Sequence, residues 1–173
     1  QSVQGVMVRG IHPELEVGIT DLPNKIKAGS LSDLKNGEFG IVLGSDLARA
    51  LGVRVDEKVM LIAPQGSITP AGMVPRLKQF RVVGIFEIGM APYDNSLALI
   101  HIGDAQKLFQ LGDAVTGISS KLRDIDQAPK IARELQRQLP PDLYANDWTH
   151  QNSNYFRAVQ MEKKMMFIIL SLI

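Results

Sequence analysis

The last nine residues of the chain, MMFIILSLI at 165–173, carry no charge and follow a charged Glu-Lys-Lys at 162–164. An amphipathic helix that packs on its own domain shows a polar residue every third or fourth position, whereas only Ser171 interrupts this run. At about 1.5 Å per residue, the run covers roughly half of a 30 Å hydrocarbon core. The sequence therefore predicts the first part of a membrane-spanning helix that continues past the last residue.

The side chains expected in the membrane are Met165, Met166, Phe167, Ile168, Ile169 and Leu170. The alternative is a C-terminal helix that docks on the core of its own domain. Lys163 and Lys164 would flank the membrane on the outer side, against the positive-inside tendency, although lysine side chains snorkel and large domains translocate regardless of such charges. The chain opens without a basic, apolar export signal, so we expect an upstream segment to direct export.

Composition excludes several classes of function. With 173 residues and 45% apolar content, the chain is long enough to bury a core as one domain or two small lobes. Its 19 basic and 18 acidic residues leave a net charge of +1, which indicates no nucleic-acid partner. Zero cysteines exclude a disulfide scaffold, thiolate catalysis and cysteine-based metal sites.

Short strands alternate with short helices along the chain. Strands are expected at 1–11, 59–63, 115–122 and 143–146, and at FGIVLG, QFRVVGIFEI and SLALIHI. Helices are expected at SDLARAL, with Ser45 as N-cap and Gly52 as terminator, at GDAQKLFQLG, which starts near Asp104 and ends at Gly112, at 127–139, and from about Asn152. Residues 14–36 support short helical turns at most. This order predicts an α+β domain with a mixed sheet at 1–152, and a stalk helix that enters the membrane at 153–173.

A proline-rich segment at 64–78 separates two strands that are expected to pair as a hairpin. Pro64, Pro70 and Pro75 each lack a donor N–H, so they cannot join a central ladder, and the segment is expected to project. Its apolar side chains suit contact with a partner that has an apolar rim, and a preorganised loop loses less entropy on docking. The alternative is an ordinary long hairpin folded onto its own domain.

Four stretches carry a family resemblance: LGSDLARALGVRVDEKVMLIAP, RVVGIFEIGMAPYDNSLALIHIGDAQKLF, VTGISSKLRDIDQAPKIARELQ and NYFRAVQMEKKMMFIILSLI. Together they resemble the periplasmic domain of the lipoprotein-releasing ABC transporter permeases, the LolC, LolE and LolF group of the macrolide-exporter-type superfamily. The last stretch is the most specific, because a Phe-Arg-Ala-Val-Gln-Met-Glu-Lys run entering a transmembrane helix is typical of that family.

The resemblance implies a subunit of an inner-membrane permease in a Gram-negative cell, with this domain in the periplasm between the first and second of four transmembrane helices. It implies a cytoplasmic ATPase, a second permease subunit and lipoprotein cargo as partners. It also implies that the proline-rich hairpin is a hook that recruits the periplasmic lipoprotein carrier. The residues expected to bind this partner are Pro64, Gln65, Ile68, Thr69, Pro70, Met73, Val74, Pro75, Arg76 and Lys78.

The family has particular polar residues at the base of the hook, where this chain has Val59, Met60 and Leu77. Arg76, Lys78 and Arg81 are expected either to steer a carrier through its carboxylates or to act as solvated charges at a strand edge. The stalk helix either transmits movements driven by nucleotide binding or simply positions the domain.

No catalytic, cofactor or metal site is expected. His12, His101 and His150 stand far apart without a metal-ligand spacing, so each is expected at the surface or at a helix cap. Gly44-Ser45 lacks the G-x-S-x-G elbow, and no Gly-Lys phosphate loop exists, so ATP hydrolysis would belong to another subunit. Two other functions stay open, namely a drug or peptide exporter domain that contacts an adaptor, and a soluble barrel-like peptide-binding or hydrolase accessory domain.

Overall fold

The structure is a computed structural model that describes residues 3–69, 72–151 and 153–171, with side chains described outside 64–74, 150–157 and 160. The chain divides into two compact units, 1–119 and 120–173. Each unit is described by itself.

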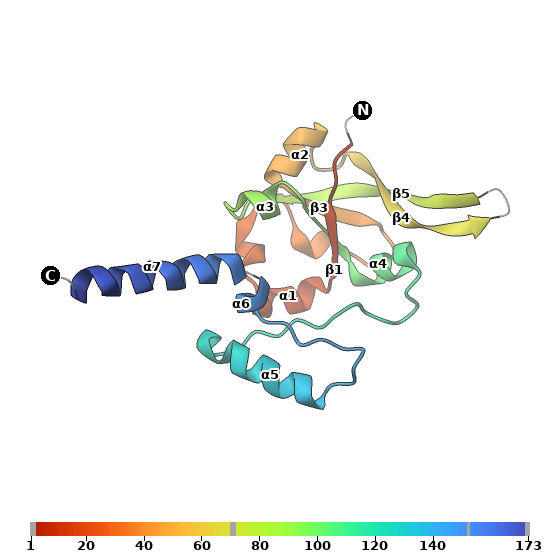
Figure 1. The fold of residues 1–173 in the computed structure, drawn as a ribbon. Coiled ribbons are helices and arrows are strands. Elements are labelled where there is room, and N and C mark those ends of the chain that lie inside the picture. The colour runs from red at the N-terminus through yellow and green to blue at the C-terminus, as the bar shows by residue number, and fades with distance from the viewer. Residues whose placement is uncertain (1–2, 70–71, 152, 172–173) are drawn as a thin grey trace. The chain divides into compact units, whose positions relative to one another are not determined.

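The first unit is built on a six-stranded mixed sheet, which confirms the α+β prediction (Figure 1). Its strands run in the order β1-β6-β3-β5-β2, and β4 also pairs with β5. The β1–β6 and β3–β5 pairs are parallel, while the β3–β6, β2–β5 and β4–β5 pairs are antiparallel. The strands are β1 Met7–Ile11, β2 Ile26–Gly29, β3 Gly40–Gly44, β4 Lys58–Thr69, β5 Gly72–Phe86 and β6 Leu97–His101.

Short helices connect these strands. The α-helices are α1 Pro13–Ile19, α2 Ser45–Leu51, α3 Ala91–Asp94 and α4 Ile102–Phe109, and two 3-10 turns are η1 Leu22–Lys25 and η2 Leu31–Asp33. The predicted stretch SDLARAL is α2, and Gly52 ends it in the left-handed conformation with φ 69°. Asp104 lies in the first turn of α4, as predicted.

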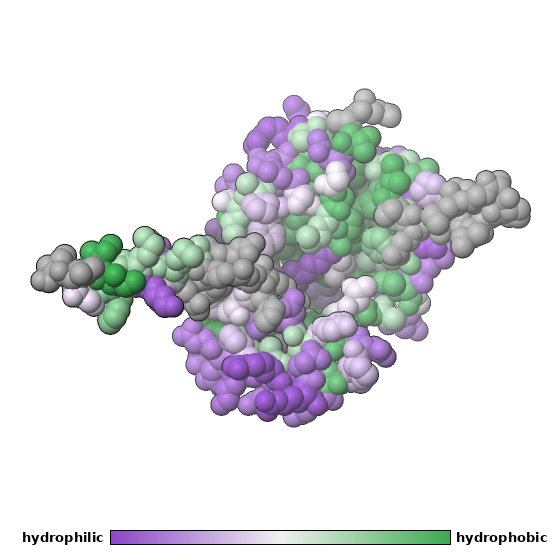
Figure 2. All heavy atoms as spheres, viewed as in Figure 1, coloured by the Kyte–Doolittle hydropathy of each residue, from purple (hydrophilic) through white to green (hydrophobic). Residues whose placement is uncertain are grey.

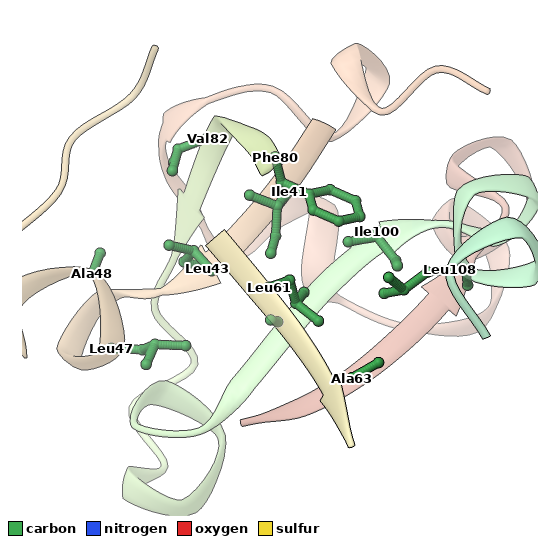
Figure 3. Close-up of a cluster of buried hydrophobic side chains, with 12 residues drawn as sticks. Ile41, Leu43, Leu47, Ala48, Leu61, Ala63, Phe80, Val82, Ile100 and Leu108 are labelled. Carbon is green, nitrogen blue, oxygen red and sulfur yellow. The ribbon is translucent and has the colours of Figure 1, made fainter. Parts of the chain in front are cut away.

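The central strands are buried on both faces, because apolar residues follow one another without alternation in β3 and β6. One cluster of buried side chains joins β3, β4, β5 and β6 to α2 and α4, and includes Ile41, Leu61, Phe80, Ile100 and Leu108 (Figure 3). A second cluster on the opposite face contains Val42, Val83 and Phe86, together with Leu22 and Leu31 of the 3-10 turns.

The second unit contains η3 Ile125–Gln127 and the α-helices α5 Ala128–Gln138, α6 Trp148–Gln151 and α7 Ser153–Ser171. The predicted helices at 127–139 and from about Asn152 are confirmed as α5 and α7, although Asn152 itself lies outside the described residues. The indole Nε1 of Trp148 donates a 3.1 Å hydrogen bond to the carbonyl of Ile125, which ties α6 to η3.

Four details of the predicted secondary structure are wrong. Residues 115–122 and 143–146 form no strand; instead, Gln136 of α5 bonds the backbone of Leu143 and Ala145. The N-cap of α2 is Gly44 rather than Ser45, because β3 runs directly into the helix. Gln110, rather than Gly112, ends α4, with φ 55°.

Other boundaries shift. The first strand is shorter than predicted, starting at Met7 rather than at the N-terminus, of which residues 1–2 lie outside the described part. The stretch 14–36 contains β2 in addition to the expected helical turns.

Candidate functional site: the β4–β5 hairpin

The β4–β5 hairpin extends past the other strands of the sheet (Figure 1). These are the two longest strands, with 12 residues in β4 and 15 in β5. Regular antiparallel pairing runs from Lys58 opposite Arg81 to Ala63 opposite Arg76. This part of the hairpin is anchored in the core by Leu61, Ala63 and Phe80. The predicted pairing of the two strands is confirmed.

Pairing does not stop where the sequence predicted a loop. Beyond a register shift, the ladder resumes with Ser67 opposite Val74 and continues to Thr69 opposite Gly72. Residues 64–66 of β4 therefore face Pro75 of β5 alone. Outside residues 70–71, which the structure does not describe, the segment predicted as a loop consists of two paired strands with an irregular stretch at 64–66. Proline is tolerated there because, outside the body of the sheet, both strands are edges, and because the bulge needs fewer donors.

We call residues 64–75 the hook. Of the residues predicted to bind a partner, Pro64, Gln65, Ile68, Thr69, Met73 and Val74 lie on its two strands, Pro75 is exposed at its base, and Pro70 lies outside the described residues. The predicted residues are thus brought together on one projecting element.

Arg76 and Lys78 already have contacts within the domain. The guanidinium of Arg76 donates from Nη1 to the carbonyl of Leu108 at 3.4 Å and from Nη2 to Oε1 of Gln110 at 2.5 Å. The Nζ atom of Lys78 lies 3.7 Å from the ring centroid of Phe39, within the range of a cation–π contact. Both cations therefore face the body of the domain at the root of the hairpin.

The opposite face of the hairpin root carries exposed apolar side chains. Met60, Ile62 and Leu77 are 57%, 52% and 59% exposed, and Ile62 stands directly opposite Leu77 in the ladder. We call these three residues the outer triad. Strand alternation places them together, since Leu61 and Ala63 point into the core. Sequence reasoning had noted Met60 and Leu77 but missed Ile62, which the alternation of 58–63 could have revealed.

Two of the three buried carboxylates among the described residues of the first unit accept backbone N–H groups. Asp104, which is fully buried, accepts the backbone N–H groups of Gly37 at 2.8 Å and Phe39 at 3.0 Å. Asp94 accepts those of Ile88 and Gly89, both at 2.8 Å. Carboxylates saturated by backbone donors fix loops, and they are poorly placed for proton transfer.

Two of the three histidines lie together. The rings of His12 and His101 meet edge to face with centroids 5.4 Å apart, and Nδ1 of His101 accepts the backbone N–H of Gly103. Burial lowers the pKa of His101, and electrostatic repulsion from the neighbouring His12 lowers it further. The prediction of a capping histidine is therefore confirmed for His101. Within the described part of the chain, no three His, Cys, Asp or Glu side chains gather as metal ligands would.

The C-terminal part of α7 presents its apolar side chains outward (Figure 2). Met165, Met166, Phe167, Ile168, Ile169 and Leu170 are all at least 55% exposed. Within the described residues, no helix combines the length and apolar composition needed to cross a membrane. Residues 172–173 lie outside the described part.

Comparison with known proteins identifies the family. The model of the MacB-like periplasmic core domain matches residues 1–138. The lipoprotein-releasing system transmembrane protein LolC of Neisseria meningitidis serogroup B is 48% identical over 172 residues, which cover 99% of this chain and 41% of that protein. LolC of Xylella fastidiosa is 42% identical over 170 residues, covering 98% of this chain and 41% of the relative.

LolE of Haemophilus influenzae, also named as a lipoprotein-releasing system transmembrane protein, is 25% identical over 169 residues, covering 97% of this chain and 40% of the relative. The chain thus spans about two fifths of the length of these relatives. Since the family model covers most of the chain, the chain belongs to the MacB-like periplasmic core domain family, as a domain of the LolC and LolE type.

Proposed function

We propose that this domain is the periplasmic part of an ABC transporter permease that releases outer-membrane lipoproteins from the inner membrane of a Gram-negative bacterium. The names of the relatives support the transport role, and the family supports the periplasmic location. In this proposal the domain is not an enzyme. ATP is hydrolysed by a separate cytoplasmic subunit, and a second permease subunit joins through the membrane part.

The domain recruits the periplasmic lipoprotein carrier through the hook at 64–75. The observation that carries this step is the β4–β5 hairpin, which extends beyond the sheet while its root is fixed in the core. An arm whose two strands are already paired before binding loses less entropy when a partner docks. The outer triad adds exposed apolar surface at the root of the hairpin. A carrier that binds around the hook therefore also covers Met60, Ile62 and Leu77.

The stalk helix α7 links the domain to the membrane. Its exposed apolar residues from Met165 to Leu170 follow the charged Glu162, Lys163 and Lys164, a sequence order that suits a crossing from water into lipid. The same helix is the element through which movement of the membrane part reaches the hook-bearing unit.

A carrier pull-down with the full-length permease tests the recruitment step. The triple substitution Ile68→Asp, Met73→Asp and Val74→Asp places three charges on the hook, and we expect carrier retention to fall at least tenfold. The matched control places the same three charges at Leu15, Val17 and Met90, which are 63%, 66% and 53% exposed on other elements. Equal retention by the hook variant and the control would refute recruitment through the hook. Retention of an exporter adaptor instead of the carrier would refute lipoproteins as the cargo.

A further inference from the structure

Arg76 stands where the hairpin changes from a fixed part to a projecting part. Its pair with Ala63 is the last regular rung before the register shift. Beyond it, residues 64–66 face Pro75, and neither Pro64 nor Pro75 supplies a backbone donor. A stretch of ladder with missing hydrogen bonds is the natural place for the arm to bend.

The Arg76 side chain crosses from this rung to the end of α4. It reaches the carbonyl of Leu108, in the last turn of the helix, and Oε1 of Gln110, which follows the helix in the left-handed conformation at φ 55°. A cation at a helix C-terminus satisfies orphan carbonyls and complements the helix dipole. The Nε atom of Arg76 is buried and has no hydrogen-bond partner among the described residues. The Nε side of the guanidinium is therefore packed against the domain, while the Nη2 bond to Gln110 lies at the surface.

The helix that Arg76 contacts, α4, is also fixed at its N-terminal end. Asp104, in the first turn of α4, fixes the backbone at Gly37 and Phe39 through two hydrogen bonds. Ala105 and Leu108 of α4 belong to the same buried cluster as Leu61 and Phe80. Arg76 therefore joins α4 to the sheet at the root of the arm, and both of these elements are anchored in the core.

We propose that Arg76 and Gln110 form a bracket that sets the direction in which the hook leaves the sheet, so that Arg76 positions the hook for its partner instead of contacting the partner. The part of this inference that concerns carrier capture rests on the proposed function, whereas the part that concerns the direction of the arm rests on the contacts alone. Without the bracket, the arm pivots at 64–66 and spends less time in the orientation that docks. Binding then weakens because the competent orientation is less populated.

Amide hydrogen exchange and carrier affinity, both measured on the full-length permease, test the bracket. Arg76→Met removes the fork and keeps an apolar chain of similar reach, whereas Gln110→Asn shortens the acceptor and still tolerates positive φ. We expect either variant to raise exchange at 66–74 severalfold and to weaken carrier binding roughly tenfold, or about 1.4 kcal/mol. The double variant is expected to add little to Arg76→Met, because that substitution already removes both contacts of the guanidinium.

The matched control is Arg81→Met, on the same strand, whose guanidinium lies 3.2 Å from Asp56 and 3.9 Å from Glu38 instead of on α4. It is expected to leave hook exchange and carrier affinity unchanged. Arg76→Lys reaches one acceptor without the fork and is expected to recover part of the affinity.

The outcomes separate this inference from the proposed function. Unchanged exchange at 66–74 in both bracket variants would overturn the bracket, even when the charged hook variant still loses the carrier. A loss of affinity without a change in exchange would make Arg76 a contact residue and would also overturn it. If the charged hook variant keeps the carrier, the recruitment proposal fails, while raised exchange in Arg76→Met and Gln110→Asn would still support the bracket.

Discussion

The Nδ1 atom of His101 accepts the backbone N–H of Gly103 at 3.1 Å and thereby closes the first turn of α4. A neutral imidazole that accepts at Nδ1 carries its proton on Nε2. Protonation at Nδ1 would place two donors face to face and remove the cap. Protonation of His101 at low pH would therefore break the N-terminal cap of α4.

We expect His101 to make the domain less stable as the pH falls below about 6.5, the ordinary pKa of histidine. Burial, His12 and Lys107 lower the pKa of His101, and Asp104 opposes them by raising it. Since the folded pKa lies below the unfolded one, the unfolded chain binds more protons in this window. The contribution of His101 to the free energy of unfolding is thus complete above pH 6.5, and it decreases as the pH falls towards the folded pKa.

Denaturant unfolding of His101→Asn between pH 5 and 8 measures this effect. Asparagine keeps an acceptor at the cap and does not titrate, so the pH dependence should flatten while stability at pH 8 stays close to wild type. His101→Ala should lose about 1 kcal/mol at pH 8 as well, because it lacks the acceptor. An unchanged pH slope in His101→Asn would rule out His101 as its source.

Asp104→Ala should be among the most damaging single substitutions in the first unit. It would leave the backbone donors of Gly37 and Phe39 without their acceptor in the interior, at a cost on the order of 3 kcal/mol. The control Asp46→Ala removes an exposed pair with Arg49 and should change the free energy of unfolding by less than about 0.5 kcal/mol. Equal effects of the two substitutions in urea denaturation would contradict a stabilising role for the hydrogen bonds from Gly37 and Phe39 to Asp104.

Gly44 is required by a close backbone approach. A Cβ atom at this position would lie 2.3 Å from the carbonyl oxygen of Asp94. Gly44→Ala should therefore cost about 2 kcal/mol, because backbone must shift. Gly18→Ala is the matched control, since its Cβ would meet nothing within 4 Å and it lies in α1, where alanine should stabilise by about 0.5–1 kcal/mol. Calorimetric unfolding of both variants should show shifts of opposite sign.

Local sequence signals were enough for the elements whose determinants are close in the chain. FGIVLG followed by SDLARAL and Gly52 predicts β3, α2 and the helix stop, because burial, helix propensity and a left-handed terminator all lie within a few residues. The β4–β5 hairpin was predictable for the same reason. The strand expected at 115–122 failed because its apolar residues are not buried: Val115 is 49% and Ile118 89% exposed.

The contacts that shape the candidate site are non-local, and the sequence could not supply them. Arg76 meets Leu108 and Gln110 across 32 and 34 positions, and Asp104 meets Gly37 across 67. In the sequence alone, the charge of Arg76 beside a proline-rich segment suggests contact with a partner protein. Only the fold reveals that the C-terminal end of α4 lies within reach of this side chain. The edge strand β2 was missed because a strand of four residues, three of them exposed and one of those a glycine, leaves no periodic signal.

The two faces of the β4–β5 hairpin separate stability from recruitment. Leu61 is 7% exposed in the core, whereas Leu77 of the outer triad is 59% exposed. Leu61→Ala should cost about 2–5 kcal/mol through the cavity that it leaves. Leu77→Asp should change the free energy of unfolding by less than about 0.5 kcal/mol, because it buries nothing new.

The same Leu77→Asp substitution should weaken carrier binding severalfold in the full-length permease, because a charge would have to be desolvated under the docked partner. Denaturant unfolding and carrier titration of the two variants, compared side by side, check this division. Carrier affinity that is insensitive to Leu77→Asp would confine recruitment to the hook and exclude the outer triad. Stability lost in Leu77→Asp would instead make the outer triad part of the fold.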